Sequence, residues 1–271
     1  MGGSLDLALR AADSGTRILG FDEDDATGRR ALERGAVTER LRAPDDLPSD
    51  VDLVVLAVPP AAAAAQVRHL ATSLPPDALV MDLSSIMLPA LAASMETPPL
   101  ADRFVAAHPL AGSETSGIES ARADLYRGAV VLIGRPLEEG APGGRAAAFW
   151  SALGAKPASI APALHDALVA LTSHLPYVAS VALVNTLRRT GSMTRTLAET
   201  AGPGLRDTTR VAASPTALWA EILERNGPKL LPALELLERE VRALRHAIQE
   251  GGPALRTKLD EARSFRQEIV P

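Results

Sequence analysis

The most constraining feature of this sequence is a change of hydrophobic pattern near residue 160. Before it, short apolar and β-branched runs alternate with stretches of helical periodicity, and after it the periodicity is almost entirely helical. Alternating strands and helices are typical of an α/β domain with a doubly wound parallel sheet. We therefore predict such a domain over residues 1–159 and an all-helical domain over residues 160–271. The predicted strands cover 16–21, 51–58, 78–83, 104–107 and 129–133, and the helices between them include 25–34 and 61–73.

The start of the chain departs from the usual pattern of such a domain. Rossmann-like dinucleotide-binding domains begin with a strand that leads into a G-x-G-x-x-G turn, whose glycines let the backbone approach a pyrophosphate. Gly2, Gly3 and Ser4 match only the end of that turn, and a flexible tip is the alternative interpretation. The domain is expected to lack its first, central strand, which leaves two sheet edges separated by a gap. We expect the natural chain to begin upstream of Met1, and the chain as written to bind a dinucleotide weakly or not at all.

Asp22 lies at the end of the first predicted strand, about 20 residues beyond Gly2. An acidic residue at that place accepts hydrogen bonds from the adenosine ribose hydroxyls and repels a 2′-phosphate. The alternative is an ordinary turn residue. Asp22 therefore favours NAD over NADP as the cofactor.

Composition and charge exclude several functions. The chain of 271 residues has no cysteine, which excludes disulfides, thiolate metal sites and cysteine nucleophiles, and no metal site is predicted. A net charge of −5 provides no basic surface for nucleic acid. The longest apolar runs, such as 53–65, contain prolines and are too short to span a bilayer. We therefore expect a cytoplasmic protein without a nucleic-acid or membrane partner.

Two segments that follow predicted strands contain side chains suited to catalysis. His108 begins a Pro-, Gly- and Ser-containing stretch after the strand at 104–107, and Asp82 to Ser85 follow the strand at 78–83. Ligands of doubly wound folds bind beyond the carboxyl ends of the strands. His108 is therefore a candidate base and Ser85 a candidate hydroxyl ligand. The alternatives are a surface loop for the first segment and a helix cap for the second.

The helical domain contributes two further candidate segments. In residues 165–177, Pro176 is predicted to interrupt a helix and turn His174 or Tyr177 toward a cleft, although a core histidine is the alternative. Arg206 and Arg210 are four residues apart and are predicted to share a helix face. Guanidinium groups bind planar carboxylates, and a solvated charged face is the alternative.

These segments resemble, in order and approximate spacing, the prephenate dehydrogenase family from Gly2 to about Arg245. The resemblance implies NAD-dependent oxidative decarboxylation of prephenate to 4-hydroxyphenylpyruvate in tyrosine biosynthesis. It also implies a homodimer formed through the helical domain. The motifs that carry the resemblance are Gly2 to Leu5, Asp22, Asp82 to Ser85, His108 to Glu114, Ser173 to Pro176, Arg206 to Arg210 and Trp219 to Asn226.

The resemblance also implies roles for individual residues. His108 would accept the hydrogen bond or proton of the substrate's ring hydroxyl, and Ser85 would hold hydroxyl and imidazole in line. Arg210 would bind a substrate carboxylate, and Arg206 would add positive potential. The other residues implied for the substrate site are His174, Tyr177, Glu114 and Trp219, and those implied for NAD are Gly2, Gly3, Ser4, Asp22, Val58 and Pro59.

The sequence departs from the family pattern at two positions. Tyr177 stands where the family usually has histidine, and Met87 stands where many members have lysine. A phenol donates a hydrogen bond but carries no positive charge, so both prephenate and arogenate remain candidate substrates. A catalytically silent dimeric binding protein is another alternative. A dehydrogenase of the β-hydroxyacid type ranks last, because residues 165–177 contain no lysine.

Overall fold

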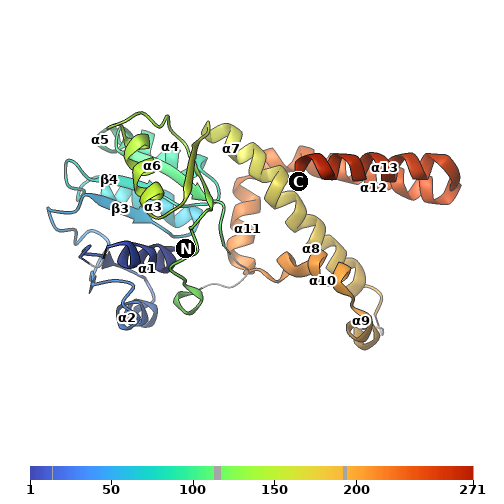
Figure 1. Ribbon diagram of the computed structural model, residues 1–271, viewed down its shortest axis with the longest axis horizontal. Helices are drawn as coiled ribbons and strands as arrows, with labels where there is room; N and C mark the ends of the chain where they lie inside the picture. Colours follow the sequence, from blue (N-terminus) through green and yellow to red (C-terminus); the bar gives the residue numbers. More distant parts are fainter. Residues whose placement is uncertain (14, 113–116, 192–193, 271) are drawn as a thin grey trace.

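The computed structural model describes residues 1–13, 15–112, 117–191 and 194–270. An α/β domain lies beside a helical domain, from which two helical arms extend (Figure 1). In the α/β domain the strands are β1 (Leu19–Gly20), β2 (Glu39–Arg40), β3 (Leu53–Leu56), β4 (Leu79–Asp82), β5 (Phe104–Pro109), β6 (Val130–Ile133) and β7 (Lys156–Ser159). Its helices are α1 (Gly2–Ala12), α2 (Asp25–Glu33), α3 (Pro60–Leu70), α4 (Leu88–Met95), α5 (Pro98–Ala101), the 3-10 helix η1 (Ile118–Ser120) and α6 (Pro142–Ala152).

The strands form two separate sheets, as the absence of a first strand predicts. β1 and β2 pair in parallel, and the other strands form a second sheet in the order β3-β4-β5-β6-β7. In the 3-2-1-4-5-6 order of a doubly wound domain, β1 and β3 would flank the first strand. Among the described residues, no strand lies between them. Residues of β1 and β3 instead line one side each of a cavity of about 1150 Å³.

The larger sheet is buried between two layers of helices, which explains its apolar sequence. Successive residues of a strand point to opposite faces. Val80 of β4 packs with α3 and α4 on one face, and Met81 packs with α1 and α6 on the other. All four residues of β4 are buried, as expected for a strand covered on both sides.

Two features of the sheet differ from the prediction. β6 pairs antiparallel with β5, although a parallel sheet was expected. β2 and β7 were not predicted, because Glu39–Arg40 and Lys156–Ser159 contain no apolar run. Both are edge strands, and an edge tolerates polar residues and a proline such as Pro157 because one side of its backbone needs no sheet partner.

The helical domain begins with a continuous helix, which corrects the expected interruption at Pro176. It comprises α7 (Pro162–Val169), a π-helical turn η2 (Ala170–His174) and α8 (Leu175–Arg188). Pro176 has no N–H to donate, and the wider π turn just before it accommodates this loss without ending the helix. The remaining elements are α9 (Thr194–Thr200), α10 (Pro203–Thr209), the 3-10 helix η3 (Arg210–Ala213), α11 (Thr216–Arg225), α12 (Gly227–Glu250) and α13 (Gly252–Ile269).

This helix also corrects the expectation about apolar length. Residues 162–188 have a mean hydropathy of 1.7 over their most apolar stretch and are long enough to cross a membrane, unlike the shorter run 53–65. The core helix of a soluble protein can have the same length and hydropathy. Several of its apolar side chains are exposed in the single chain, namely Leu164, Leu168, Leu171 and Val184.

Candidate active site

A chain of hydrogen-bonded side chains connects the two domains at the end of β5. His108 is the penultimate residue of β5, and its Nδ1 lies 2.9 Å from Nε2 of His165 on α7. The other ring nitrogen of His165, Nδ1, lies 2.8 Å from Oδ1 of Asp166. His165 and Asp166 are both almost fully buried. A titratable group from the α/β domain is thus held by two polar residues of the helical domain.

Two carboxylates of the helical domain also cap helices of the α/β domain. The Asp166 carboxylate accepts hydrogen bonds from the backbone N–H groups of Met87 (2.8 Å) and Leu88 (3.1 Å) at the start of α4. Glu221 of α11 accepts a hydrogen bond from the backbone N–H of Ala61 at the start of α3. A carboxylate at a helix N-terminus satisfies free N–H groups and complements the helix dipole. These contacts hold the two domains together beside His108.

Asn226 extends this polar cluster toward the aromatic residues. Its side-chain N–H₂ group donates to the backbone oxygen of Asp166 at 2.8 Å and lies 3.1 Å from Nδ1 of His174. His174 ends the π turn and is buried, and its ring contacts Trp219 edge-on, with centroids 5.9 Å apart. The π turn therefore directs His174 into a buried polar cluster, which is the core position given above as the alternative to a cleft.

Tyr177 and Trp219 form a flat aromatic surface next to His174. Their rings are parallel, with an interplanar angle of 3° and centroids 3.7 Å apart. Stacked aromatic rings present a rigid apolar face at low cost in conformational entropy. The structure thus brings together four of the predicted residues, His108, His174, Tyr177 and Trp219, through polar contacts that the sequence analysis did not anticipate.

Burial shifts the ionisation of the two histidines in the same direction. Desolvation, followed by the neighbouring His165, lowers the pKa of His108 to about 3, and Asp166 opposes this shift only in part. Desolvation also lowers the pKa of His174 to about 4. Both imidazoles are therefore neutral at pH 7, and each retains a nitrogen lone pair that can accept a proton.

Ser85 is presented by a fixed turn at the end of β4. Oδ1 of the buried Asp82 accepts hydrogen bonds from the backbone N–H (3.2 Å) and the hydroxyl (2.8 Å) of Ser84. β4 and β5 are parallel neighbours, so Ser85 and His108 follow the same edge of the sheet. Burial raises the pKa of Asp82 to about 7. Asp82 thus shapes the turn that precedes Ser85.

The remaining predicted substrate residues lie on separate segments. Arg206 is on α10, where its Nε donates to the backbone oxygen of Ala201 at 3.2 Å. Arg210 begins η3 directly after α10, and both segments pack against α8, the helix that carries Tyr177. The predicted shared helix face is thus divided between an α-helix and a 3-10 turn. Glu114 lies outside the described residues.

The predicted cofactor residues line one cavity. Gly2, Gly3, Ser4, Asp22, Val58 and Pro59 all line the cavity of about 1150 Å³ that includes the gap between β1 and β3. α1 begins at Gly2, so its N-terminus faces this space, and such an end binds phosphate through backbone N–H groups and the helix dipole. Burial raises the pKa of Asp6, in the same wall, to about 7, which weakens its repulsion of an anion. These residues fit a dinucleotide.

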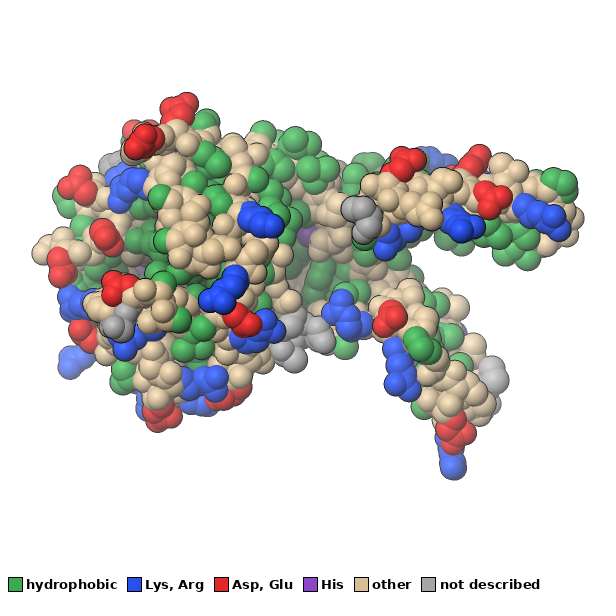
Figure 2. Space-filling model, viewed as in Figure 1, with side chains coloured by type: hydrophobic (Ala, Val, Ile, Leu, Met, Phe, Trp, Pro, Cys, Tyr) green, Lys and Arg blue, Asp and Glu red, His purple; other side chains and the backbone are tan. Residues whose placement is uncertain are grey.

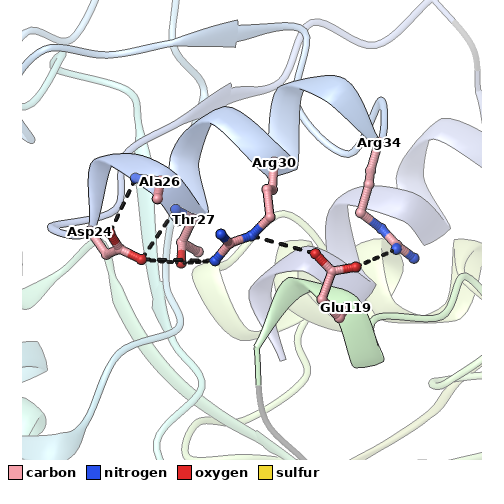
Figure 3. A network of polar contacts seen from close by, with 6 residues as sticks. All are labelled: Asp24, Ala26, Thr27, Arg30, Arg34 and Glu119. Carbon is pink, nitrogen blue, oxygen red and sulfur yellow. Dashed lines mark hydrogen bonds and ion pairs between the residues drawn. The ribbon is translucent and has the colours of Figure 1, made fainter.

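An ion-pair network joins the cofactor side to the loop that follows β5 (Figure 3). Asp24 caps α2 by accepting hydrogen bonds from the backbone of Ala26 and Thr27. Farther along α2, Arg30 and Arg34 contact the two carboxylate oxygens of Glu119 on η1, at 3.4 and 3.0 Å. The charged side chains of the network are exposed, so it connects α2 to η1 but contributes little to stability.

Sequence reasoning missed three residues of the site: His165, Asp166 and Asn226. His165 and Asp166 were noted only as the start of a segment, and Asn226 only as the end of a motif. An adjacent His-Asp pair on an otherwise apolar helix is the one signal that could have identified the first two. Nothing in the local sequence links them to His108, which is 57 residues away from His165.

The fold and the site define a class of protein. A doubly wound domain with a cavity suited to a dinucleotide is joined to a helical domain by a buried histidine cluster at the strand ends, which is the arrangement of a two-domain dehydrogenase. A family model described as "Prephenate dehydrogenase, nucleotide-binding domain" matches residues 5–156. A second, described as "Prephenate dehydrogenase, dimerization domain", matches residues 161–261. The chain belongs to the prephenate dehydrogenase family.

Individual relatives agree with this assignment. A cyclohexadienyl dehydrogenase from Zymomonas mobilis is 31% identical over 222 residues, which cover 81% of this chain and 74% of the relative. The crystal structure of prephenate dehydrogenase from A. aeolicus in complex with hydroxyphenyl propionate and NAD⁺ superimposes with a TM-score of 0.88, at 29% identity, over 99% of this chain and 94% of that one. Synechocystis arogenate dehydrogenase gives a TM-score of 0.78 at 27% identity, over 99% and 96%.

Proposed function

We propose that this protein catalyses the NAD-dependent oxidative decarboxylation of prephenate to 4-hydroxyphenylpyruvate, as a cytoplasmic homodimer. The observation that carries the proposal is His108, a neutral imidazole at the carboxyl end of β5 that is anchored by the helical domain. A neutral imidazole can accept the hydrogen bond of a substrate hydroxyl. The relative from A. aeolicus, which was crystallised with NAD⁺ and hydroxyphenyl propionate, supports both the cofactor and a phenyl-ring substrate.

The residues of the chain divide the work of binding and orientation. His108 accepts the hydrogen bond of the ring hydroxyl, and Ser85 holds that hydroxyl in line with the imidazole. Arg210 binds a substrate carboxylate, while Arg206 adds positive potential. Tyr177 and Trp219 form an apolar wall for the ring, and His174 lies at its edge.

The cofactor half of the site is formed by the cavity beside α1. Gly2, Gly3 and Ser4 would hold the pyrophosphate at the start of α1, and Asp22 would bind the adenosine ribose. Val58 and Pro59 follow β3 and would line the nicotinamide side. When bound, NAD⁺ supplies the hydride acceptor. Loss of carbon dioxide from the substrate then leaves an aromatic ring, which makes the overall reaction strongly favourable.

Arogenate is the second candidate substrate, and one residue favours it. Tyr177 is uncharged where the family usually has histidine, and it lies flat against Trp219. A neutral phenol at this position does not repel a protonated amino group, whereas an imidazolium would. Arogenate carries an amino group where prephenate has a ketone, so the two substrates differ in the charge that the site must accept.

The surface of the helical domain supports the proposed homodimer. Two arms extend from it, one formed by α12 and α13 and the other by α8 to α10 (Figure 1). Apolar side chains are exposed along both arms between charged ones (Figure 2). Extended apolar surfaces of this kind mark protein interfaces. The exposed apolar residues on α12 and α13 are Leu231, Leu236, Val241, Ile248, Leu259, Phe265 and Ile269.

The proposal is tested by following NADH at 340 nm with NAD⁺ and either prephenate or arogenate, and by identifying the product. His108→Asn should lower kcat by roughly 100-fold or more, the scale of general acid–base catalysis. His69→Asn is the matched control, because His69 is an exposed histidine of the same domain. A folded dimer that turns over neither substrate would favour the catalytically silent binding protein instead. A comparable loss in His69→Asn would show that the effect on His108 is unspecific.

A further inference from the structure

Asp166, His165 and His108 form a row of contacts in which the donor and the acceptor of each hydrogen bond can be assigned. A carboxylate has no proton to donate, so the hydrogen between Asp166 Oδ1 and His165 Nδ1 belongs to the imidazole. Nδ1 of His165 is therefore the protonated nitrogen of that ring. In a neutral imidazole the other nitrogen, Nε2, then carries a lone pair and acts as an acceptor.

The tautomer of His165 also decides which ring nitrogen of His108 carries a proton. Its Nδ1 lies 2.9 Å from His165 Nε2. Because that nitrogen is the acceptor, the contact is a hydrogen bond only if His108 Nδ1 carries the proton. His108 Nε2 is then left unprotonated. Burial keeps the pKa of His108 at about 3, so the ring stays neutral at pH 7 and this assignment of protons is the resting state.

We propose that Asp166 and His165 are positioning residues that hold His108 in the Nδ1–H tautomer, with the lone pair of Nε2 directed to the substrate hydroxyl. The catalytic meaning of this inference rests on the proposed function. In the opposite tautomer, His108 Nε2 would carry a hydrogen and could only donate to the hydroxyl oxygen. The hydroxyl could then donate neither its hydrogen bond nor its proton to the imidazole.

The anchoring of Asp166 makes the arrangement a property of both domains together. Its carboxylate is held by the backbone of Met87 and Leu88 in the α/β domain, and its backbone oxygen by Asn226 in the helical domain. Either histidine ring could rotate if Asp166 moved. The tautomer of His108 therefore depends on correct docking of α7 against the start of α4.

The tautomer can be measured without substrate or cofactor. The chain has five histidines, so two-bond ¹H–¹⁵N NMR spectra of the full-length protein labelled with ¹⁵N-histidine can be assigned by single substitutions. We expect the Nδ1–H tautomer for both His108 and His165 at pH 7.5. Free histidine prefers Nε2–H, so an Nε2–H signal for His108 in the wild-type protein would overturn the inference. This result does not depend on activity.

Two substitutions of His165 separate positioning from mere packing. Gln places an acceptor oxygen where His165 Nε2 lies, whereas Leu fills similar space without one. His165→Gln should keep the Nδ1–H tautomer of His108, and His165→Leu should convert it to Nε2–H. In turnover with the better substrate, we expect His165→Leu to lower kcat roughly 10- to 100-fold with KM changed less than about threefold, and His165→Gln to stay within about fivefold of wild type.

Equal losses in the two variants, or a loss confined to KM, would overturn the positioning role. Circular dichroism and dimer size, measured on both variants, identify a folding defect. If the wild-type protein turned over neither substrate, the proposed function would fail, while the tautomer of His108 would still decide the structural part of the inference.

Discussion

Asn226→Asp tests whether the polar contacts behind His174 are as specific as the distances indicate. The substitution preserves size but replaces the N–H₂ group with an acceptor oxygen. That oxygen would lie 2.8 Å from the backbone oxygen of Asp166 and 3.1 Å from His174 Nδ1, in a site that is almost fully buried. Two hydrogen bonds become repulsive contacts. Burying the new carboxylate is costly unless it or a neighbouring group takes up a proton.

The magnitude follows from the pKa of His174. The cheapest response is for the folded variant to take up one proton, on His174 or on the new carboxyl group. Protonating an imidazole whose pKa lies at about 4 costs about 5.5 kcal/mol at pH 8, because each pH unit above the pKa costs about 1.4 kcal/mol. Attraction between the resulting charges offsets part of this cost. We therefore expect a loss of about 3 to 5 kcal/mol at pH 8 and of about 1 to 2 kcal/mol at pH 5.5.

The sign of the pH dependence follows from proton counting. The folded variant holds one more proton at this pair than the folded wild type, whereas the unfolded chains bind equal numbers above about pH 5. The stability difference must therefore shrink as the pH falls. Urea denaturation at both pH values and at one protein concentration measures it, with the exposed Asn185→Asp as the matched control. A loss that does not depend on pH, or one no larger than that of Asn185→Asp, would refute the reasoning.

Three further predictions concern the base, the cofactor site and the split sheet. Because burial and His165 lower the pKa of His108 to about 3, the acid limb of kcat/KM should lie well below the ordinary histidine pKa of about 6.5; a limb at 6.5 in the pH–rate profile would contradict this. Asp22→Asn removes a charge that repels a 2′-phosphate and should raise kcat/KM with NADP⁺ relative to NAD⁺ roughly tenfold, equivalent to about 1.4 kcal/mol; an unchanged ratio would exclude Asp22 from the ribose site. An N-terminal extension that ends in a designed apolar strand should pair with β1 and β3 and raise the Tm by about 4 °C or more, since 1 kcal/mol shifts the Tm of a chain of this size by about 2 to 4 °C; a Gly/Ser extension of equal length that raises it equally would argue against strand pairing.

Much of the fold follows from local patterns in the sequence. Strands β3, β4, β5 and β6 coincide with apolar runs, of which β4 and most of β5 are buried on both faces. Helix α2 begins and ends close to where its acidic start and basic end indicate. The edge strands β2 and β7 were missed because an edge needs no apolar run. The antiparallel direction of β6 was missed because strand direction depends on the path of the connecting loop, not on the strand's own residues.

The candidate site shows the same division between local and distant information. The sequence by itself determined which residues are candidates for the site, such as His108, Asp22 and the pair Tyr177 and Trp219, because a motif is a local pattern. Only the tertiary structure decided that His165 and Asp166 lie behind His108, because a hydrogen bond between distant residues depends on how two domains dock. Likewise, only the tertiary structure decided that β1 and β3 lie on two sides of one cavity with no strand of the described residues between them, because strand pairing joins segments that are far apart in the sequence.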